Sequence, residues 1–159
     1  MQIRRAALCD LPGVTRLLEQ VLDIHHKGRP DIFRAHTRKY TDDELTQIFD
    51  DDSRPVFVAV DENASPGEVL GYAFCIHQQH VDDNVLTDIR TLYIDDLCVN
   101  EDARGRHIGS ALYRHVIDYA RETDCYNVTL NVWACNESAR RFYERMGLAP
   151  QKIGMEVVL

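Results

Sequence analysis

The chain of 159 residues is 45% hydrophobic and 28% charged, and its formal net charge is −8. This length and composition predict one globular domain over residues 1–159, large enough to bury a core without disulfides or metals. The acidic balance argues against a nucleic-acid-binding surface, which would need clustered positive charge, and it is compatible with a cationic partner.

The cysteines indicate a reducing compartment. Their number is odd and they form no Cys-x-x-Cys pair, which argues against a disulfide framework or a zinc site. No signal-peptide core is visible near the N-terminus, and no stretch approaches the roughly 18 apolar residues of a membrane span. We therefore expect a cytoplasmic protein with no metal and no membrane contact. The cysteines are Cys9, Cys75, Cys98, Cys125 and Cys135.

The first part of the chain predicts a strand and then a helix. Residues 2–7 form the short strand. Apolar residues at helical spacing over 11–22 predict the helix, with Asp10 placed to cap it. Gly28 and Pro30 end this helix and lead into an irregular segment.

A second helix and a hairpin follow. The Thr41-x-x-Glu44 pattern is that of a capping box, and the helix that it opens ends near the acidic run 50–52. Residues 55–61 and 68–78 predict two antiparallel strands. The turn between them contains Asn63, Ser65, Pro66 and Gly67.

The second half of the chain alternates strands and helices, which predicts an α/β fold. Asn136 is placed as a helix cap and Gly147 as a helix stop. The expected elements are a strand over 92–99, a helix from Ile108, a strand over 126–132, a helix between Asn136 and Gly147, and a last strand over 153–159.

The loop Arg-Gly-Arg-His-Ile-Gly-Ser at residues 104–110 lies between a predicted strand and a predicted helix. Backbone N–H groups, the helix dipole and two arginines together favour a phosphate ligand. A solvated loop that merely starts a helix is the alternative. Neither the P-loop nor the G-x-G-x-x-G dinucleotide fingerprint is present.

The spacing Arg104-x-x-His107-x-Gly109 resembles the pyrophosphate loop Q/R-x-x-G-x-G/A of the GNAT superfamily of N-acetyltransferases. His107 replaces the middle glycine, so we expect it to adopt a negative φ, with its side chain turned from the phosphates or donating to them. Residues 130–148 resemble the second signature of the family, L-x-V-x-x-x-N-x-x-A-x-x-F-Y-x-x-x-G-F. Residues 93–99 are similar to its fourth strand, which carries the acetyl-binding bulge.

The resemblance implies the GNAT fold, an α/β fold whose mixed central sheet splays between the fourth and fifth strands, with helices on both faces. It also implies acetyl-CoA as co-substrate, with the diphosphate on the loop and the pantetheine in the splayed gap. Asn136 matches the pantetheine-binding position; it is equally well a plain helix cap, and both roles are compatible. The implied coenzyme-binding residues are Leu97, Cys98, Val99, Arg104, Gly105, Arg106, His107, Ile108, Gly109, Ser110, Asn136 and Tyr143.

Tyr143 stands where many GNAT enzymes keep the general acid that protonates the departing thiolate. A phenol with a pKa of about 10 is protonated at neutral pH and can donate. A core aromatic beside Phe142 is the alternative. The glutamate that serves as base in some members is here Asn131.

The pair Asp95 and Asp96 is the better candidate for the base, because a similar acidic pair occurs in members that acetylate cationic small molecules. Neighbouring strand residues point to opposite faces, so we expect Asp95 to take the proton and Asp96 to orient the acceptor. The alternative is that one or both carboxylates are bound to nearby arginines.

The resemblance places an acceptor pocket at the end of the first helix. We expect Asp96, His26, Phe33 and Trp133 to contact the acceptor. The alternatives are a surface histidine near a helix C-terminus and a tryptophan packed under the last strand.

Two classes of function stay open. One is an acetyl-CoA-dependent N-acetyltransferase in which the primary amine of a small cationic or amino-acid-like acceptor attacks directly in a ternary complex; a peptide or protein acceptor is a variant of it. The other is a non-catalytic acyl-CoA-binding module, in which His107 or Asn131 marks lost chemistry. The sequence leaves open whether the chain is a monomer or a homodimer.

Overall fold

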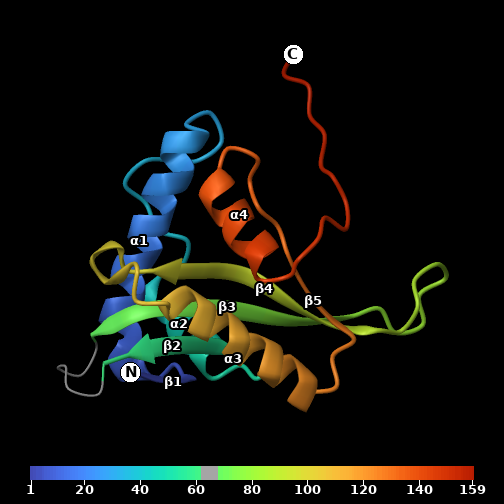
Figure 1. Ribbon diagram of the computed structural model, residues 1–159, viewed down its shortest axis with the longest axis horizontal. Coiled ribbons are helices and arrows are strands. Elements are labelled where there is room, and N and C mark those ends of the chain that lie inside the picture. The colour runs from blue at the N-terminus through green and yellow to red at the C-terminus, as the bar shows by residue number, and fades with distance from the viewer. Residues whose placement is uncertain (62–67) are drawn as a thin grey trace.

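The computed structural model describes residues 1–61 and 68–159. Its centre is a five-stranded sheet in the order β1-β2-β3-β4-β5 (Figure 1). Neighbouring strands are antiparallel except β4 and β5, which are parallel. The strands are β1 (Gln2–Arg5), β2 (Val56–Val60), β3 (Val69–Gln79), β4 (Arg90–Val99) and β5 (Asn127–Leu130).

Helices cover both faces of the sheet, as expected. Alternate residues of a strand point to opposite faces, and both faces of β2 are apolar. Val56 and Val58 belong to the core under α1 and α2, whereas Phe57 and Ala59 belong to the core under α3. The helices are α1 (Leu11–Gly28), α2 (Asp42–Phe49), α3 (Ile108–Glu122) and α4 (Glu137–Arg145), with short 3-10 turns η1 (Leu8–Asp10) and η2 (Glu101–Ala103).

The two helix caps predicted in the first half of the chain differ in outcome. The Thr41–Glu44 capping box is confirmed, because Thr41 Oγ1 accepts from the Glu44 N–H (3.3 Å) and Glu44 Oε2 accepts from the Thr41 N–H (2.7 Å). The buried Asp10 makes no side-chain cap on α1. Its carboxylate instead accepts from both terminal nitrogens of Arg4 (2.6 and 2.9 Å) and from the Ala7 N–H (2.8 Å). This carboxylate therefore joins β1 to the start of α1.

The sheet splays between β4 and β5, which confirms the expected layout. Residues 91–94 of β4 pair with residues 127–130 of β5, and β4 then continues to Val99 after β5 has ended. A β-bulge lies at the same point. Phe74 of β3 pairs with Asp96 and Cys75 pairs with Ile94, so Asp95 is an extra residue in β4.

The predicted last strand over 153–159 is wrong. Residues 149–159 are exposed, form no strand, and run from the end of α4 past the β5 side of the sheet (Figure 1). A strand forms only where its backbone groups pair, and no strand of the described residues pairs with this segment. The predicted hairpin turn at 63–67 lies outside the described residues. None of the helices described is long and apolar enough to cross a membrane.

Candidate active site

The loop after β4 has two left-handed residues. The buried Ala103 of η2 anchors its start, and the buried Ile108 begins α3. Between them, Gly105 has a φ of +78° and His107 a φ of +59°. The loop thus turns sharply twice before the helix.

The expectation of a negative φ at His107 is wrong. His107 keeps the left-handed backbone that a glycine adopts freely, and it is the exposed N-cap residue of α3. The turn into α3 therefore outweighs the ordinary preference of an L-residue for a negative φ. A left-handed conformation costs an ordinary L-residue roughly 1–2 kcal/mol.

Replacing His107 with Gly should therefore stabilise the fold. A gain of about 1 kcal/mol in the free energy of unfolding would raise Tm by about 2–4 °C in a chain of this size. Thermal melts of His107→Gly and His107→Ala test this, because alanine removes the imidazole and keeps the strained Cβ. A glycine variant that melts no higher than the alanine variant would contradict the strain.

Free backbone N–H groups converge at this loop. In the described part of the chain, the amides of residues 105–110 have no protein acceptor, and Ala111 is the first to donate within α3, to the His107 carbonyl (3.0 Å). Arg106 lies 4.0 Å from Asp61, an exposed pairing that leaves its charge accessible. The exposed side chains around these amides are Arg104, Arg106 and His107. This arrangement at a helix N-terminus is suited to a diphosphate.

The end of β4 presents main-chain groups to the gap left by β5. The Asn100 N–H donates to the Leu70 carbonyl of β3 (2.9 Å). Hydrogen-bonding direction alternates along an antiparallel strand, so Cys98 also faces β3, and Leu97 and Val99 direct their N–H groups toward the gap.

The side chain of Gln20 of α1 holds the end of β4 in place. Its Nε2 donates to the Val99 carbonyl (3.1 Å) and to Cys98 Sγ (3.4 Å), and its Oε1 accepts from the Glu101 N–H (3.1 Å). Burial raises the pKa of Cys98 to about 12. The Cys98 thiol is therefore protonated and is no nucleophile at neutral pH.

The acidic pair has partners that the sequence did not reveal. Asp95 Oδ2 accepts from Lys39 Nζ (2.6 Å) and from the Tyr40 hydroxyl (2.9 Å). Asp96 Oδ2 accepts from the Tyr72 hydroxyl (2.7 Å). Neither Asp95 nor Asp96 has an arginine partner among the described residues.

The expectation that the two carboxylates lie on opposite faces is wrong. Tyr40 and Tyr72 both pack on the Phe74 ring, with centroids 5.7 and 5.0 Å away, so Asp95 and Asp96 find their partners in one core region. The bulge is the reason, because an extra residue interrupts the alternation of side chains.

The two carboxylates differ in environment. Burial raises the pKa of Asp96 to about 6, against the opposing effects of the Tyr72 hydrogen bond and the positive charge of Lys39. Asp95 is instead bound directly to the ammonium group of Lys39. A carboxylate with a pKa near 6 is well matched to accept a proton at neutral pH.

Tyr143 of α4 is a protonated phenol with an available hydroxyl. Burial, and next the negative charge of Asp96, raise the pKa of Tyr143 well above its ordinary value. Its half-buried ring packs near Phe142 and Tyr113, at centroid distances of 5.1 and 6.4 Å. No hydrogen bond of its hydroxyl is present among the described residues. The group can therefore donate to a ligand.

Asn136 caps α4, as predicted. Its side-chain oxygen accepts from the Ala139 N–H (3.1 Å), and its own N–H donates to the Trp133 carbonyl (2.8 Å). The side-chain amide nitrogen has no partner in the described residues, so it is available to a ligand.

Three of the predicted acceptor residues lie together. Phe33 makes an edge-to-face contact with Trp133 at a centroid distance of 5.2 Å, and its carbonyl lies 2.7 Å from His26 Nδ1. His25 stacks on Phe33 at 4.9 Å. Burial, and next the charge of Lys39, lower the pKa of His25. The charge of Lys39, which binds Asp95, therefore also acts on His25 in this aromatic cluster.

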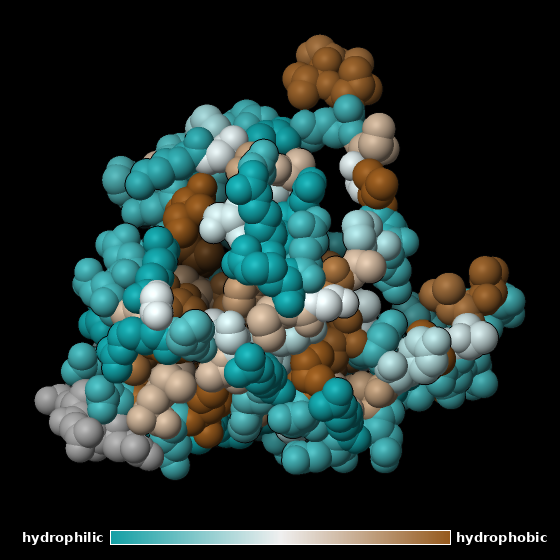
Figure 2. Space-filling view, viewed as in Figure 1, coloured by the Kyte–Doolittle hydropathy of each residue, from teal (hydrophilic) through white to brown (hydrophobic). Residues whose placement is uncertain are grey.

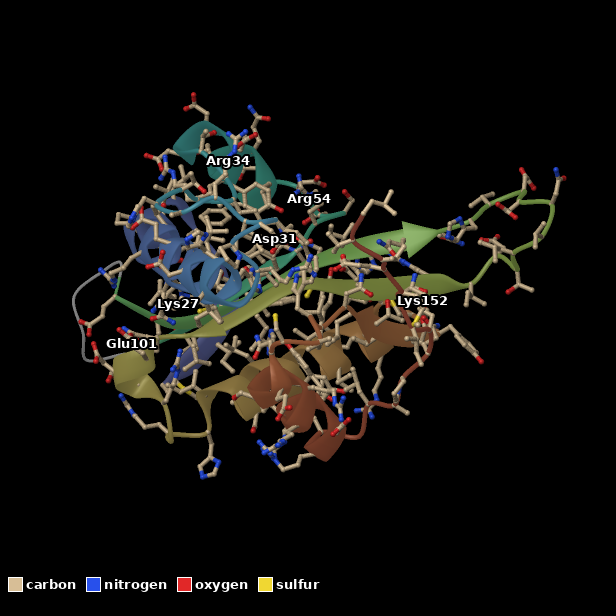
Figure 3. The ribbon with its side chains drawn as sticks, turned by 90° about the horizontal axis from the view of Figure 1, so that it is seen from above. Lys27, Asp31, Arg34, Arg54, Glu101 and Lys152 are labelled. Atoms are coloured by element: carbon tan, nitrogen blue, oxygen red, sulfur yellow. The ribbon has the colours of Figure 1, made fainter. Side chains whose placement is uncertain are left out.

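Figure 3 shows the sheet from above, with a layer of helices on each side of it. Helices α1 and α2 lie on one side of the sheet and α3 and α4 on the other, with β4 between them. The site residues that sequence reasoning missed are Lys39, Tyr40 and Tyr72. The position of Tyr72 beside Asp96 can be deduced once the register of β3 and β4 is known. Lys39 and Tyr40 lie in the irregular segment before α2, where no sequence pattern indicated a contact with Asp95. The described residues contain no group of three or more candidate metal ligands.

Comparison with known sequences identifies the family. The model of the Acetyltransferase (GNAT) family matches residues 18–148. Glucosamine 6-phosphate N-acetyltransferase 1 of Oryza sativa subsp. japonica is 30% identical over 66 residues, which are 42% of this chain and 38% of that protein. Streptothricin acetyltransferase of Streptomyces lavendulae is 35% identical over 100 residues, 63% of this chain and 47% of that protein. The matched regions are less than half the length of these two relatives.

Solved structures agree with the family model. The tetramutant of the BH1408 protein from Bacillus halodurans superposes with a TM-score of 0.93 at 33% identity, over 100% of both chains. The sheet that parts after β4, the loop at the start of α3 and the matching family model lead to one conclusion. The chain belongs to the GNAT family of N-acetyltransferases.

Proposed function

We propose that this chain transfers the acetyl group of acetyl-CoA to the primary amine of a small cationic or amino-acid-like acceptor, by direct attack in a ternary complex. The observation that carries the proposal is the gap between β4 and β5, which is bordered by a carboxylate with a raised pKa, Asp96, and by a protonated phenol, Tyr143. A base for the incoming amine and an acid for the leaving thiolate are the two groups that aminolysis of a thioester needs.

The coenzyme would be held by main-chain groups along its length. The amides of residues 105–110 would bind the diphosphate, supported by the charges of Arg104 and Arg106. The N–H groups of Leu97 and Val99, which point away from β3, would lie beside the pantetheine and the thioester. A donor there stabilises the charge that develops on the acetyl oxygen during attack. Asn136 would donate its amide to the pantetheine arm.

We assign the base to Asp96 and a positioning role to Asp95, the reverse of the expectation from sequence. Asp96 has the pKa of about 6 that suits a base, and it is not tied to a cation. Asp95 holds Lys39 and Tyr40 against the sheet, and so shapes the entrance used by the acceptor.

The proposed transfer is a single displacement at the thioester carbon. The amine nitrogen attacks the thioester carbon, and its proton passes to Asp96, directly or through water. The C–S bond breaks, and the departing thiolate takes the proton of the Tyr143 hydroxyl. Cys98 takes no part, because its thiol stays protonated. The acetyl group therefore passes directly to the amine and never to the protein.

The non-catalytic alternative has lost one of its two supports. His107 keeps the left-handed backbone of the loop, so this substitution does not change the backbone that we propose for the diphosphate. The exposed Asn131, which donates to the Tyr93 hydroxyl (3.1 Å), is the remaining support. The enzyme has the greater support, because the pKa of Asp96 suits a base, and the Tyr143 hydroxyl is protonated and has no hydrogen-bond partner among the described residues.

A two-stage assay tests the proposal. Thermal shift with acetyl-CoA first establishes coenzyme binding. Release of the free thiol is then followed over a panel of glucosamine 6-phosphate, streptothricin, aminoglycosides, polyamines, amino acids and peptides with free N-termini. We expect a rise in Tm and turnover on at least one small amine. Binding with no turnover on any amine would support the acyl-CoA-binding module, and turnover on peptides alone would support a peptide acetyltransferase.

Gly109 provides a test of the proposed diphosphate site at the amides of residues 105–110. A Cβ at this position would lie 3.5 Å from both Phe142 and Val99, which is ordinary contact, so a small side chain fits. Gly109→Asp should abolish coenzyme binding, because it places a negative charge beside the diphosphate. Gly109→Ala is the matched control and should bind with near wild-type affinity. An aspartate variant that folds and binds acetyl-CoA within twofold of wild type would exclude this site.

A further inference from the structure

Two neighbouring carboxylates lie at the bulge of β4, and a cation balances one of them. Lys39, in the segment before α2, places its Nζ 2.6 Å from Asp95 Oδ2. The partner of Asp96 is the Tyr72 hydroxyl (2.7 Å), and no cation pairs with Asp96 in the described part of the chain. The acidic pair alone would suit a cationic acceptor. Because Lys39 offsets one of its charges, the structure instead presents one ammonium group and one uncompensated carboxylate.

The ammonium group of Lys39 has donors that are not used. It carries three N–H donors, and Asp95 is its only hydrogen-bond acceptor among the described residues. The Lys39 side chain is 41% exposed, whereas the Asp95 side chain is 17% exposed. The carboxylate is thus the inner member of this ion pair and the ammonium group is the outer one. A ligand can therefore reach the two remaining donors.

The charge of Lys39 acts on both parts of the expected acceptor site. Burial raises the pKa of Asp96, and the Tyr72 hydrogen bond and then the charge of Lys39 oppose this rise. Burial, followed by the charge of Lys39, also lowers the pKa of His25, which stacks on Phe33. An acceptor that contacts this aromatic cluster and reaches Asp96 would therefore come within the field of the ammonium group.

The nearby surface otherwise offers an acceptor apolar contact. Figure 2 shows apolar side chains exposed between α1 and α4. Phe33 and Trp133 add an aromatic contact to this side of the molecule. A charged group that leaves water for such a surface needs a charged or hydrogen-bonding partner. Lys39 can supply this partner to an anion, and Asp96 can supply it to the ammonium form of the incoming amine.

We propose that the acceptor is an amine that also carries a carboxylate or a phosphate, and that Lys39 binds this anionic group while the amine faces Asp96. Lys39 would thereby select the acceptor of the transfer proposed above, on which this assignment rests. A hydrogen bond between an ammonium group and an anion is stronger than one between neutral groups. A polyamine would instead place its second cation near Lys39, and like charges at close range oppose binding.

Matched pairs of acceptors test this selection. Each amino acid of the amine panel is compared with the amine formed by its decarboxylation, and glucosamine 6-phosphate is compared with glucosamine. Free-thiol release is measured at about pH 8, where Asp96 is ionised. In at least one comparison the anionic member should have the higher kcat/KM by roughly 10–100-fold, as expected of one hydrogen bond to a charged group. The first comparison reports a carboxylate and the second a phosphate, so the two anions are distinguished.

Variants of Lys39 show whether its ammonium group makes the selection. Lys39→Met keeps an unbranched side chain without the charge, and it should reduce the preference within a pair by roughly 10-fold or more, mainly through the KM of the anionic acceptor. An effect on Asp96 cancels in this ratio, because both members of a pair give their proton to the same base. Lys39→Arg keeps the charge and should retain a preference. Lys27→Met is the matched control and should leave the preference unchanged, because Lys27 of α1 (Figure 3) is exposed and has no ion pair in the described residues.

The contrary results are distinct from one another. A wild-type enzyme that prefers the decarboxylated amines, glucosamine or polyamines would overturn the anionic acceptor and leave acetyl transfer itself intact. A preference that survives Lys39→Met would place the anion elsewhere. Equal loss of preference in Lys39→Met and Lys27→Met would indicate a general surface field instead of a bond to Lys39. No turnover on any amine would overturn the proposed function, and the selection by Lys39 with it.

Discussion

Replacing Tyr143 with Phe is expected to lower kcat by about 10²–10⁴-fold and to leave the affinity for acetyl-CoA almost unchanged. The phenylalanine ring keeps the contacts with Phe142 and Tyr113, and the hydroxyl that is lost makes no hydrogen bond within the described residues. Stability should therefore be unaffected. What disappears is the proton donor for the departing thiolate.

Tyr113→Phe is the matched control, because it removes the same group from the neighbouring buried ring. Single-turnover measurements with any accepted amine compare the two variants where chemistry limits the rate. The control should react at the wild-type rate. A Tyr143→Phe enzyme that keeps more than about half of wild-type kcat would show that Tyr143 is a core residue only.

Replacing Asp96 with Asn is expected to lower turnover by about 10²–10⁴-fold, the range typical of general acid–base catalysis. In wild type, kcat/KM should rise with pH through the pKa of Asp96, about 6, because the carboxylate must be ionised to accept a proton. This rise should be absent from the variant. Asp95→Asn, the control at the neighbouring carboxylate, should mainly raise the KM for the acceptor. Equal loss of turnover in both variants would contradict the separate roles.

The same substitution should stabilise the protein at neutral pH. The pKa of Asp96 is raised from 3.8 to about 6 in the folded state. The folded state therefore binds the proton more tightly than the unfolded state, and this contribution to stability is lost as pH rises through about 6. Asparagine is neutral at every pH and can still accept from Tyr72. Thermal melts should show that Asp96→Asn exceeds wild type by more at pH 8 than at pH 4.5. A variant that melts below wild type at pH 8 would exclude an unfavourable buried charge.

Strong local signals predicted most of the fold correctly. The Thr41–Glu44 box, the cap at Asn136 and the left-handed Gly147 after α4 each fix an element boundary through its own hydrogen bonds or backbone angle. The splayed sheet was predicted from the resemblance to a family and not from hydrophobic periodicity. The pattern within one strand does not show which strand pairs with it, so the pairing of β4 with β5 could not be predicted from either strand alone.

The remaining features depend on contacts between distant segments. The bulge at Asp95 arises from the β3–β4 register, and it overrode the alternation expected of neighbouring residues. Lys39 reaches Asp95 from an irregular segment 56 residues away in sequence. Residues 153–159 have the pattern of a strand but form none here, because a pattern predicts a strand only when an edge is available to pair with it.

The most direct test of the proposed mechanism is a crystal structure of the chain with acetyl-CoA bound. We expect the diphosphate within hydrogen-bond distance of the amides of 105–110, and the thioester between β4 and β5 beside Leu97 and Val99. The Tyr143 hydroxyl should face the sulfur, and the Asp96 carboxylate should face the acetyl carbon from the acceptor side. A coenzyme bound elsewhere, or a thioester beyond the reach of both Tyr143 and Asp96, would contradict the proposed mechanism.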